Sequence, residues 1–319
     1  MHKILRISLA SLIISSLVLG LLYKYMDKET LNLNKKVRAE IGGQYASIKN
    51  GVVHYQLNTD ALRKNPNAEL VILVHGFSSP MYLFDPTFEY LVKQGFQVLR
   101  FDLFGRGFSD RPHSDYTMKL YVKQLHDLLN TLKIQNKVNL VGLSMGGAIV
   151  THFTNHYPDK VNKISLIDPL FHTPVRPEIT AVKVPLLGEY LAKVIIVPKL
   201  LNGVSDTVFN INTFPDWKAK FTPQTQYQGY SRAILQTARY LSGKNFKMEY
   251  EKMGQLGKPV QLFWGKQDQI IPFSDSKKVI EAIPGIEFHA IDQAGHLPHY
   301  EQADVVNSFI GNFLRTPPL

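Results

Sequence analysis

Short apolar runs recur along the chain, and each one stops at a polar residue or a glycine. Segments with a helical pattern lie between most of them, so strand-like and helix-like stretches alternate. This alternation is typical of an α/β fold in which a mostly parallel central sheet carries helices on both faces. The expected strands are residues 70–74, 96–101, 138–143, 164–167, 260–264 and 286–291, and the expected helices are residues 86–94, 118–132, 145–157 and 274–282.

Two segments fall outside this alternation. Residues 45–48 and 52–57 flank an Asn-Gly pair, which predicts a β-hairpin ahead of the parallel strands. Residues 169–240 are apolar, rich in proline and aromatic residues, and too long for an ordinary crossover. We expect them to form a helical cap, or lid, over the carboxyl ends of the strands, where ligands bind in such sheets. The core is then divided into residues 41–168 and residues 241–319.

The first residues of the chain carry a targeting pattern. Two basic residues precede an uncharged run over residues 7–23, and a lysine follows that run directly. We interpret residues 1–26 as a signal anchor or a signal peptide, with membrane contact through this segment. The protein is then expected at a membrane, or in the periplasm or outside the cell if the segment is cleaved. The polar residues 27–40 are interpreted as a linker.

Charge and cysteine content exclude several classes of function. The net charge is +10, but no long basic run stands outside the N-terminal region, so nucleic acid is not expected as a partner. The chain has no cysteine, which excludes disulfides, a thiolate nucleophile and cysteine-ligated metals. No motif indicates a metal site or a cofactor, and neither is expected.

A G-x-S-x-G pentapeptide, Gly142 to Gly146, joins the expected strand 138–143 to the expected helix 145–157. The motif requires this strand–turn–helix context to be meaningful. In such a sharp turn, glycines avoid collisions and the serine side chain is lifted out of the sheet. The N-terminus of the following helix also points at negative charge that forms beside the serine. Ser144 is therefore the candidate nucleophile.

A serine nucleophile needs a general base, and the base needs a carboxylate to orient it. His296 lies in the loop after the last expected strand, where a histidine has little structural role, and it is the candidate base. Asp268 follows the expected strand 260–264, beside that loop, and is the candidate acid. Asp168 also ends a strand and remains the alternative acid.

Acyl transfer builds negative charge on the substrate oxygen, and preorganised N–H groups stabilise that charge. One donor is expected to be the backbone N–H of Met145, directly after the serine. The second is expected to be the N–H of Phe77, in the loop after strand 70–74, where Gly76 allows a close turn. His75 is expected to be hydrogen-bonded within this loop rather than catalytic.

Other charged residues near these positions are assigned supporting roles. His299 is expected to support the site or to lie at the surface. Glu301 is interpreted as a charge in the first turn of the final helix. Arg106 is expected to form an internal salt bridge to Asp102 or Asp110, with a clamp for a substrate anion as the alternative.

These motifs resemble those of the α/β-hydrolase superfamily from about residue 45 to the C-terminus. The H-G-F loop, the D-x-x-G-R-G-x-S-D-R-P loop, G-x-S-M-G-G, G-x-x-D and G-H-x-P occur in order. They look most like the serine esterase and lipase branch that includes monoacylglycerol-lipase-like proteins. Epoxide hydrolases and haloalkane dehalogenases are similar but have an aspartate where Ser144 stands. The resemblance implies cofactor-free ester hydrolysis through an acyl-enzyme, and some members take their acid from the position of Asp168.

The expected function is hydrolysis of carboxylic esters by a serine hydrolase. Lipid-like acyl esters of the monoacylglycerol or lysophospholipid type are the expected substrates, because the N-terminal segment and the lid are apolar. Two alternatives stay open. The same triad acts on another acyl or carbon–carbon bond, or the fold is a catalytically silent binding protein.

Overall fold

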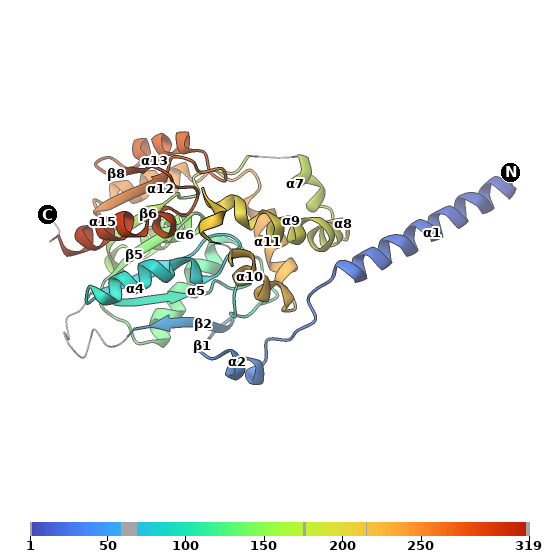
Figure 1. Cartoon of the computed structure of the whole chain (residues 1–319), viewed down its shortest axis with the longest axis horizontal. Coiled ribbons are helices and arrows are strands. Elements are labelled where there is room, and N and C mark those ends of the chain that lie inside the picture. Colours follow the sequence, from blue (N-terminus) through green and yellow to red (C-terminus); the bar gives the residue numbers. More distant parts are fainter. Residues whose placement is uncertain (1, 59–68, 175–176, 215, 317–319) are drawn as a thin grey trace.

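The computed structural model of the chain describes residues 2–58, 69–174, 177–214 and 216–316. In this part of the chain, the strands form one sheet with the order β1-β2-β4-β3-β5-β6-β7-β8 (Figure 1). The strands are β1 Gln44–Ile48, β2 Gly51–Leu57, β3 Leu70–Val74, β4 Gln97–Phe101, β5 Val138–Leu143, β6 Val161–Ile167, β7 Val260–Gly265 and β8 Glu287–Ile291.

Strand pairing is antiparallel at one edge of the sheet and parallel elsewhere. The hairpin β1–β2 pairs antiparallel with β4, and β4, β3, β5, β6, β7 and β8 run parallel. In the register, Gly142 of β5 lies opposite Val74 of β3 and Leu166 of β6. The carboxyl ends of the central strands therefore meet at one edge of the sheet, which confirms the expected α/β architecture.

The central strands β3, β5, β6 and β7 are almost entirely buried because helices cover both faces of the sheet. Alternate side chains of β3 enter different cores: Ile72 and Val74 join one hydrophobic cluster, and Val71 and Leu73 join the other. Helices on the first face are α5 Met118–Thr131, α6 Met145–His156, α12 Lys247–Gln255 and α13 Ser276–Ala282. Helices on the second face are α4 Asp85–Lys93 and α15 Ala303–Arg315, with the short α14 Pro298–Glu301 before α15.

The edge strand β8 differs from the other expected strands. A fully buried strand is predicted over residues 286–291, but β8 begins at Glu287, and only Ile291 in it is buried. Because β8 has a neighbour on one side only, part of its surface faces solvent.

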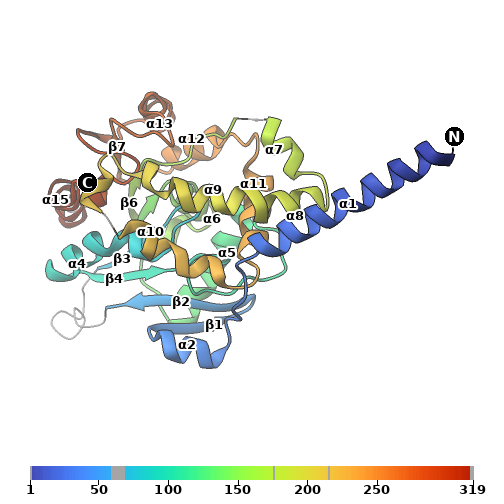
Figure 2. The same cartoon turned by 45° about the vertical axis from the view of Figure 1, so that its right-hand side comes forward.

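A helical insertion separates β6 from α12 and β7. Figures 1 and 2 show its helices gathered beside the sheet, on the side from which the N-terminal helix projects. Its elements are α7 Pro177–Val182, α8 Leu187–Leu191, a π-helical turn Ala192–Ile196, α9 Val197–Asn202, α10 Trp217–Phe221 and α11 Tyr230–Leu241. Short 3-10 turns complete the molecule at Met81–Phe84, Pro158–Lys160, Gly203–Thr207, Ile211–Thr213, Thr222–Gln226 and Phe273–Asp275.

The N-terminal segment forms the helix α1, His2–Met26, which projects away from the rest of the molecule (Figure 2). Where its side chains are described, the large apolar residues Leu12, Leu17 and Leu21 are exposed. Within the described residues, no helix combines the length and the apolar character needed to cross a membrane.

Residues 27–40, interpreted from the sequence as a linker, are fastened to the insertion. The Glu29 carboxylate accepts hydrogen bonds from the backbone N–H groups of Gly229 and Ser231, at 2.7 and 2.6 Å. Leu31 forms a parallel bridge with Tyr227. The helix α2, Lys35–Ile41, begins in the same segment, capped by the side chain of Asn34.

Candidate active site

Ser144 stands in a strained turn between β5 and α6, with φ 54° and ψ −121°. Such a conformation is unfavourable for a residue with a side chain, and the surrounding contacts hold it in place. A Cβ on Gly146 would lie 2.1 Å from the Val74 carbonyl oxygen, and one on Gly142 would lie 2.6 Å from the Gly146 carbonyl oxygen. The two outer glycines of the motif are therefore required by close packing of the backbone.

His296 and Asp268 are brought together by the loops that follow β8 and β7. His296 Nδ1 lies 2.7 Å from Asp268 Oδ2, and both side chains are buried. Asp268 Oδ1 accepts hydrogen bonds from the backbone N–H groups of Ile270 and Ile271, at 2.7 and 3.0 Å. Burial opposes ionisation of Asp268, but the His296 ring and these N–H donors outweigh it and lower the pKa of the Asp268 carboxyl.

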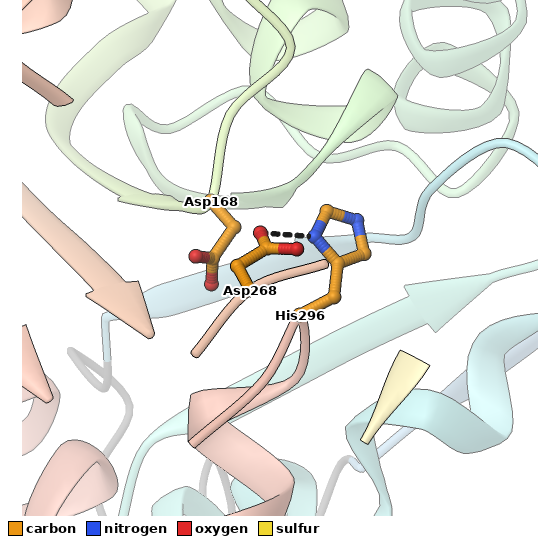
Figure 3. Close-up of side chains that lie close together, drawn as sticks. All are labelled: Asp168, Asp268 and His296. Atoms are coloured by element: carbon orange, nitrogen blue, oxygen red, sulfur yellow. Dashed lines mark hydrogen bonds and ion pairs between the residues drawn. The ribbon is translucent and has the colours of Figure 1, made fainter. Parts of the chain in front are cut away.

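Asp168 faces Asp268 from the end of β6, on the side away from His296 (Figure 3). It is fully buried with φ 39°, and its Oδ1 accepts a 2.9 Å hydrogen bond from the Gly265 N–H. Burial and the neighbouring charge of Asp268 raise the pKa of the Asp168 carboxyl well above its usual value. Of the two aspartates proposed from the sequence, Asp268 is therefore the one hydrogen-bonded to His296. Asp168 lies on the other side of Asp268.

The same three side chains form the group among the described residues whose spacing suits a metal ion. Their ligand atoms lie within 4.8 Å of one another. However, His296 Nδ1 and Asp268 Oδ2 are already joined by their hydrogen bond. That hydrogen bond is the contact expected of an acid–histidine pair.

The loop after β3 places Phe77 beside the serine. Phe77, Ser144 and Met145 line the same cavity. His75 fixes the loop, because its Nδ1 lies 3.0 Å from the Gly76 carbonyl oxygen and its Nε2 accepts a 2.9 Å hydrogen bond from the Leu103 N–H. Burial lowers the pKa of His75 to about 4, so the ring is neutral near pH 7 and can accept that bond.

Arg106 also braces this loop, which corrects its expected role. Its guanidinium is fully buried and donates hydrogen bonds to the Phe77 carbonyl at 2.6 Å, the Tyr121 hydroxyl at 2.8 Å and the Thr237 hydroxyl at 2.9 Å. The expected salt bridge to Asp102 or Asp110 is not formed. In their ion pairs, Asp102 contacts His54 and Asp110 contacts Arg38.

Glu301 and His299 follow His296 in the chain, and their hydrogen bonds stabilise the loop that contains His296. Glu301 is an acidic residue in the first turn of the four-residue α14, which directly precedes the final helix α15 in which it was expected. Its carboxylate accepts a 2.9 Å hydrogen bond from the Gly295 N–H and a 2.5 Å bond from the Phe209 N–H of the insertion. His299 is fully buried, and its Nε2 lies 3.0 Å from the Leu83 carbonyl oxygen.

Two cavities with mainly apolar walls share Ser144. We name the first the inner arm; it measures about 560 Å³ and lies between the segment after β6, the end of α11 and the loop after β7. We name the second the lid arm; it measures about 680 Å³, lies between the Phe77 loop and helices α7–α9, and includes His296. Ser144 therefore lies at the junction of the two cavities, so the two parts of a substrate on either side of the reacting bond could each occupy one cavity.

Comparison with known proteins identifies the family. The family model described as the alpha/beta hydrolase fold matches residues 69–303, well over half of the chain. The chain belongs to the α/β-hydrolase family. This hydrolase is 25% identical over 283 residues to a protein of Paraburkholderia xenovorans named 2-hydroxy-6-oxononadienedioate/2-hydroxy-6-oxononatrienedioate hydrolase, covering 85% of this chain and 94% of that one.

Solved structures show the same fold. An enol-lactonase from Burkholderia xenovorans superposes with a TM-score of 0.72 at 19% identity, covering 86% of this hydrolase and all of that chain. A thermophilic esterase from Thermogutta terrifontis gives a TM-score of 0.70 at 24% identity, covering 86% of this chain and 98% of that one. The superfamily expected from the sequence is confirmed, but none of these three proteins points to the monoacylglycerol-lipase-like branch.

Proposed function

We propose that this hydrolase cleaves carboxylic esters through an acyl-enzyme on Ser144, with His296 as general base and Asp268 as the acid that orients it. The proposal depends mainly on one observation. Ser144, in its strained turn, and His296, held by Asp268, line one cavity large enough for a small organic substrate.

In the proposed reaction, Ser144 Oγ attacks the ester carbonyl carbon while His296 Nε2 takes the hydroxyl proton. The carbonyl oxygen becomes an anion, which the N–H groups of Phe77 and Met145 stabilise. When the bond to the leaving oxygen breaks, His296 returns the proton to that oxygen, and an alcohol departs. A water molecule then attacks the acyl-enzyme in the same way, which releases the carboxylic acid and restores the serine.

Lipid-like acyl esters, of the monoacylglycerol or lysophospholipid type, are the substrates that we propose. The mainly apolar walls of both arms support this choice, since an acyl chain would exchange water for aliphatic side chains there. The exposed apolar side chains of α1 fit contact with a lipid surface as part of the same proposal.

Hydrolysis of p-nitrophenyl esters over a range of acyl lengths tests the proposal. We expect turnover in the wild type, with a fall of on the order of 10⁶-fold in Ser144→Ala, and labelling of Ser144 by a fluorophosphonate probe in the wild type alone. Ser308→Ala, on α15, is the matched control and should keep both properties. Ester turnover that survives in Ser144→Ala would refute the mechanism.

Hydrolysis of a carbon–carbon bond is the second candidate, because one relative is named for a 2-hydroxy-6-oxo acid. A dienoic acid of that class, supplied beside the ester series, separates the two candidates. Higher kcat/KM for the ester supports the first proposal, and higher kcat/KM for the 2-hydroxy-6-oxo acid supports the second.

A further inference from the structure

A second aspartate–histidine pair lies in the inner arm, apart from the pair that serves Ser144. His172 follows β6 closely, and Asp275 lies in the turn before α13. His172 Nδ1 is 3.3 Å from Asp275 Oδ2, and Lys278 Nζ is 2.7 Å from the other oxygen of the same carboxylate. Asp275 is buried, and a backbone bridge to Asn245 holds His172 in place.

This pair adds an imidazole and a carboxylate to a mainly apolar chamber, whose other polar wall residues besides Ser144 are Thr173 and Ser242. His172 and Asp275 line the inner arm together with Ser144, and aliphatic side chains such as Leu170, Leu241 and Ile271 supply most of the remaining wall. In apolar pockets, a few placed polar groups fix the orientation of the ligand. The His172 side chain is 35% exposed, yet its Nδ1 is buried and makes no hydrogen bond, its contact with Asp275 being an ion pair. The accessible edge of the ring is therefore the one that includes Nε2.

The chemistry at Ser144 indicates which part of a substrate reaches this pair. His296 must return a proton to the leaving alcohol, and it lines the lid arm. The leaving group therefore belongs in the lid arm. The acyl group stays on Ser144 with its oxygen near Met145, and Met145 lines the inner arm. The acyl chain thus extends into the inner arm.

We propose that the inner arm binds acyl groups that carry a hydroxyl, and that His172 Nε2 accepts a hydrogen bond from it. The Asp275 carboxylate lies 3.3 Å from Nδ1, and its negative charge favours a proton on that nitrogen over one on the more distant Nε2, which leaves a lone pair on Nε2. This inference names the substrate class for the proposed esterase activity and depends on that activity.

Esters with matched acyl chains test the inference. For each of several chain lengths, kcat/KM is measured for the p-nitrophenyl ester of an ω-hydroxy acid and for the ester with a methyl group in place of the hydroxyl. At the length that reaches His172, we expect the wild type to prefer the hydroxy ester by roughly two- to tenfold, the factor that one neutral hydrogen bond supplies. Esters of ω-carboxy acids are measured beside them.

Three variants separate the hydrogen bond from a general effect on packing. His172→Phe keeps a planar ring but has no acceptor, so the preference for the hydroxy ester should disappear. His172→Gln offers an amide oxygen and should keep part of it. His113→Phe changes an exposed histidine outside both arms and should keep the wild-type ratio.

The inference is overturned if the wild type shows no preference at any length, if the preference survives in His172→Phe, or if the carboxy ester is the better substrate. Failure of the proposed function has a different signature. In that case neither ester of a pair is cleaved by the wild type, or cleavage is unaffected in Ser144→Ala.

Discussion

Two buried carboxylates, Asp268 and Asp168, lie on the Nδ1 side of the His296 ring. The pKa of one is lowered and that of the other is raised. The hydrogen bonds and the histidine facing Asp268 favour its charged form, whereas burial beside that charge favours the protonated form of Asp168. Like charges so close together resist joint ionisation, so the pair is expected to hold one proton between them. The sequence favoured Asp268 and left Asp168 open as the alternative, because both residues follow strands of the same sheet.

Replacing each aspartate by asparagine should separate their roles. Asp268→Asn removes the charge that orients and stabilises the His296 ring, so kcat for ester hydrolysis should fall by on the order of 10⁴-fold. Asp168→Asn is close in shape to a protonated carboxyl, and kcat should stay within about tenfold of wild type. Steady-state kinetics on one ester measures both. An equal or larger loss in Asp168→Asn would transfer the role of triad acid to Asp168.

The raised pKa of Asp168 also predicts how stability depends on pH. The unfolded chain releases this proton near the usual pKa of 3.8, whereas the folded protein holds it to higher pH. Stability from this group is thus complete below the usual value and is lost as pH rises through the folded pKa. Asp168→Asn removes that loss, so its Tm relative to wild type should rise as the pH increases from about 4 toward the raised pKa of Asp168.

Thermal unfolding across this pH range, followed by fluorescence, measures the difference in Tm. Asp159→Asn is the control, because Asp159 is exposed. Its difference from wild type should stay flat. A flat difference for Asp168→Asn as well would show that Asp168 ionises at its usual pH in the folded protein.

At the scale of elements, strands were easier to predict than loop contacts. A run such as Leu70–Val74 is apolar at every position because both faces of the sheet are covered, and that requirement is visible locally. The edge strand β8 has a weaker requirement, and its burial was predicted less well. Arg106 was misassigned because its partner Thr237 lies 131 residues away in the insertion, and sequence spacing carries no sign of that contact.

The bracing role of Arg106 predicts a defect in catalysis rather than in binding. Arg106→Lys keeps the charge but cannot reach Phe77, Tyr121 and Thr237 together, since an ammonium lacks the guanidinium fork. The Phe77 N–H should then be displaced from the substrate oxygen, and kcat should fall by about tenfold or more with a smaller change in KM. Arg315→Lys, at the exposed end of α15, should keep wild-type kcat. A rise in KM with unchanged kcat would contradict this role.

At the scale of the whole molecule, the chain joins its N-terminal helix to the walls of the lid arm. Tyr23 of α1 stacks on Tyr190 of α8 with ring centroids 6.1 Å apart, and Lys193 pairs with Asp27. Glu29 then caps α11. The sequence predicted a linker here because the residues are polar, but polar residues form these contacts once the insertion lies beside them. Whatever α1 touches is therefore held close to α8 and the π-helical turn, which supply Leu191 and Ile195 to the lid arm.

Contact of α1 with a lipid surface can be tested by flotation of the full chain with vesicles of phosphatidylglycerol and phosphatidylcholine. The exposed side chains of Leu17 and Leu21 would leave water on binding, each contributing on the order of 1–2 kcal/mol, and the basic residues beside them favour anionic lipid. The double variant Leu17→Ser/Leu21→Ser should therefore lower the bound fraction by at least tenfold. Val305→Ser/Phe309→Ser, which removes exposed apolar side chains from α15, should leave it unchanged. Equal binding of both double variants would show that α1 does not make the contact. The helix would then not bring the lid arm close to a lipid surface.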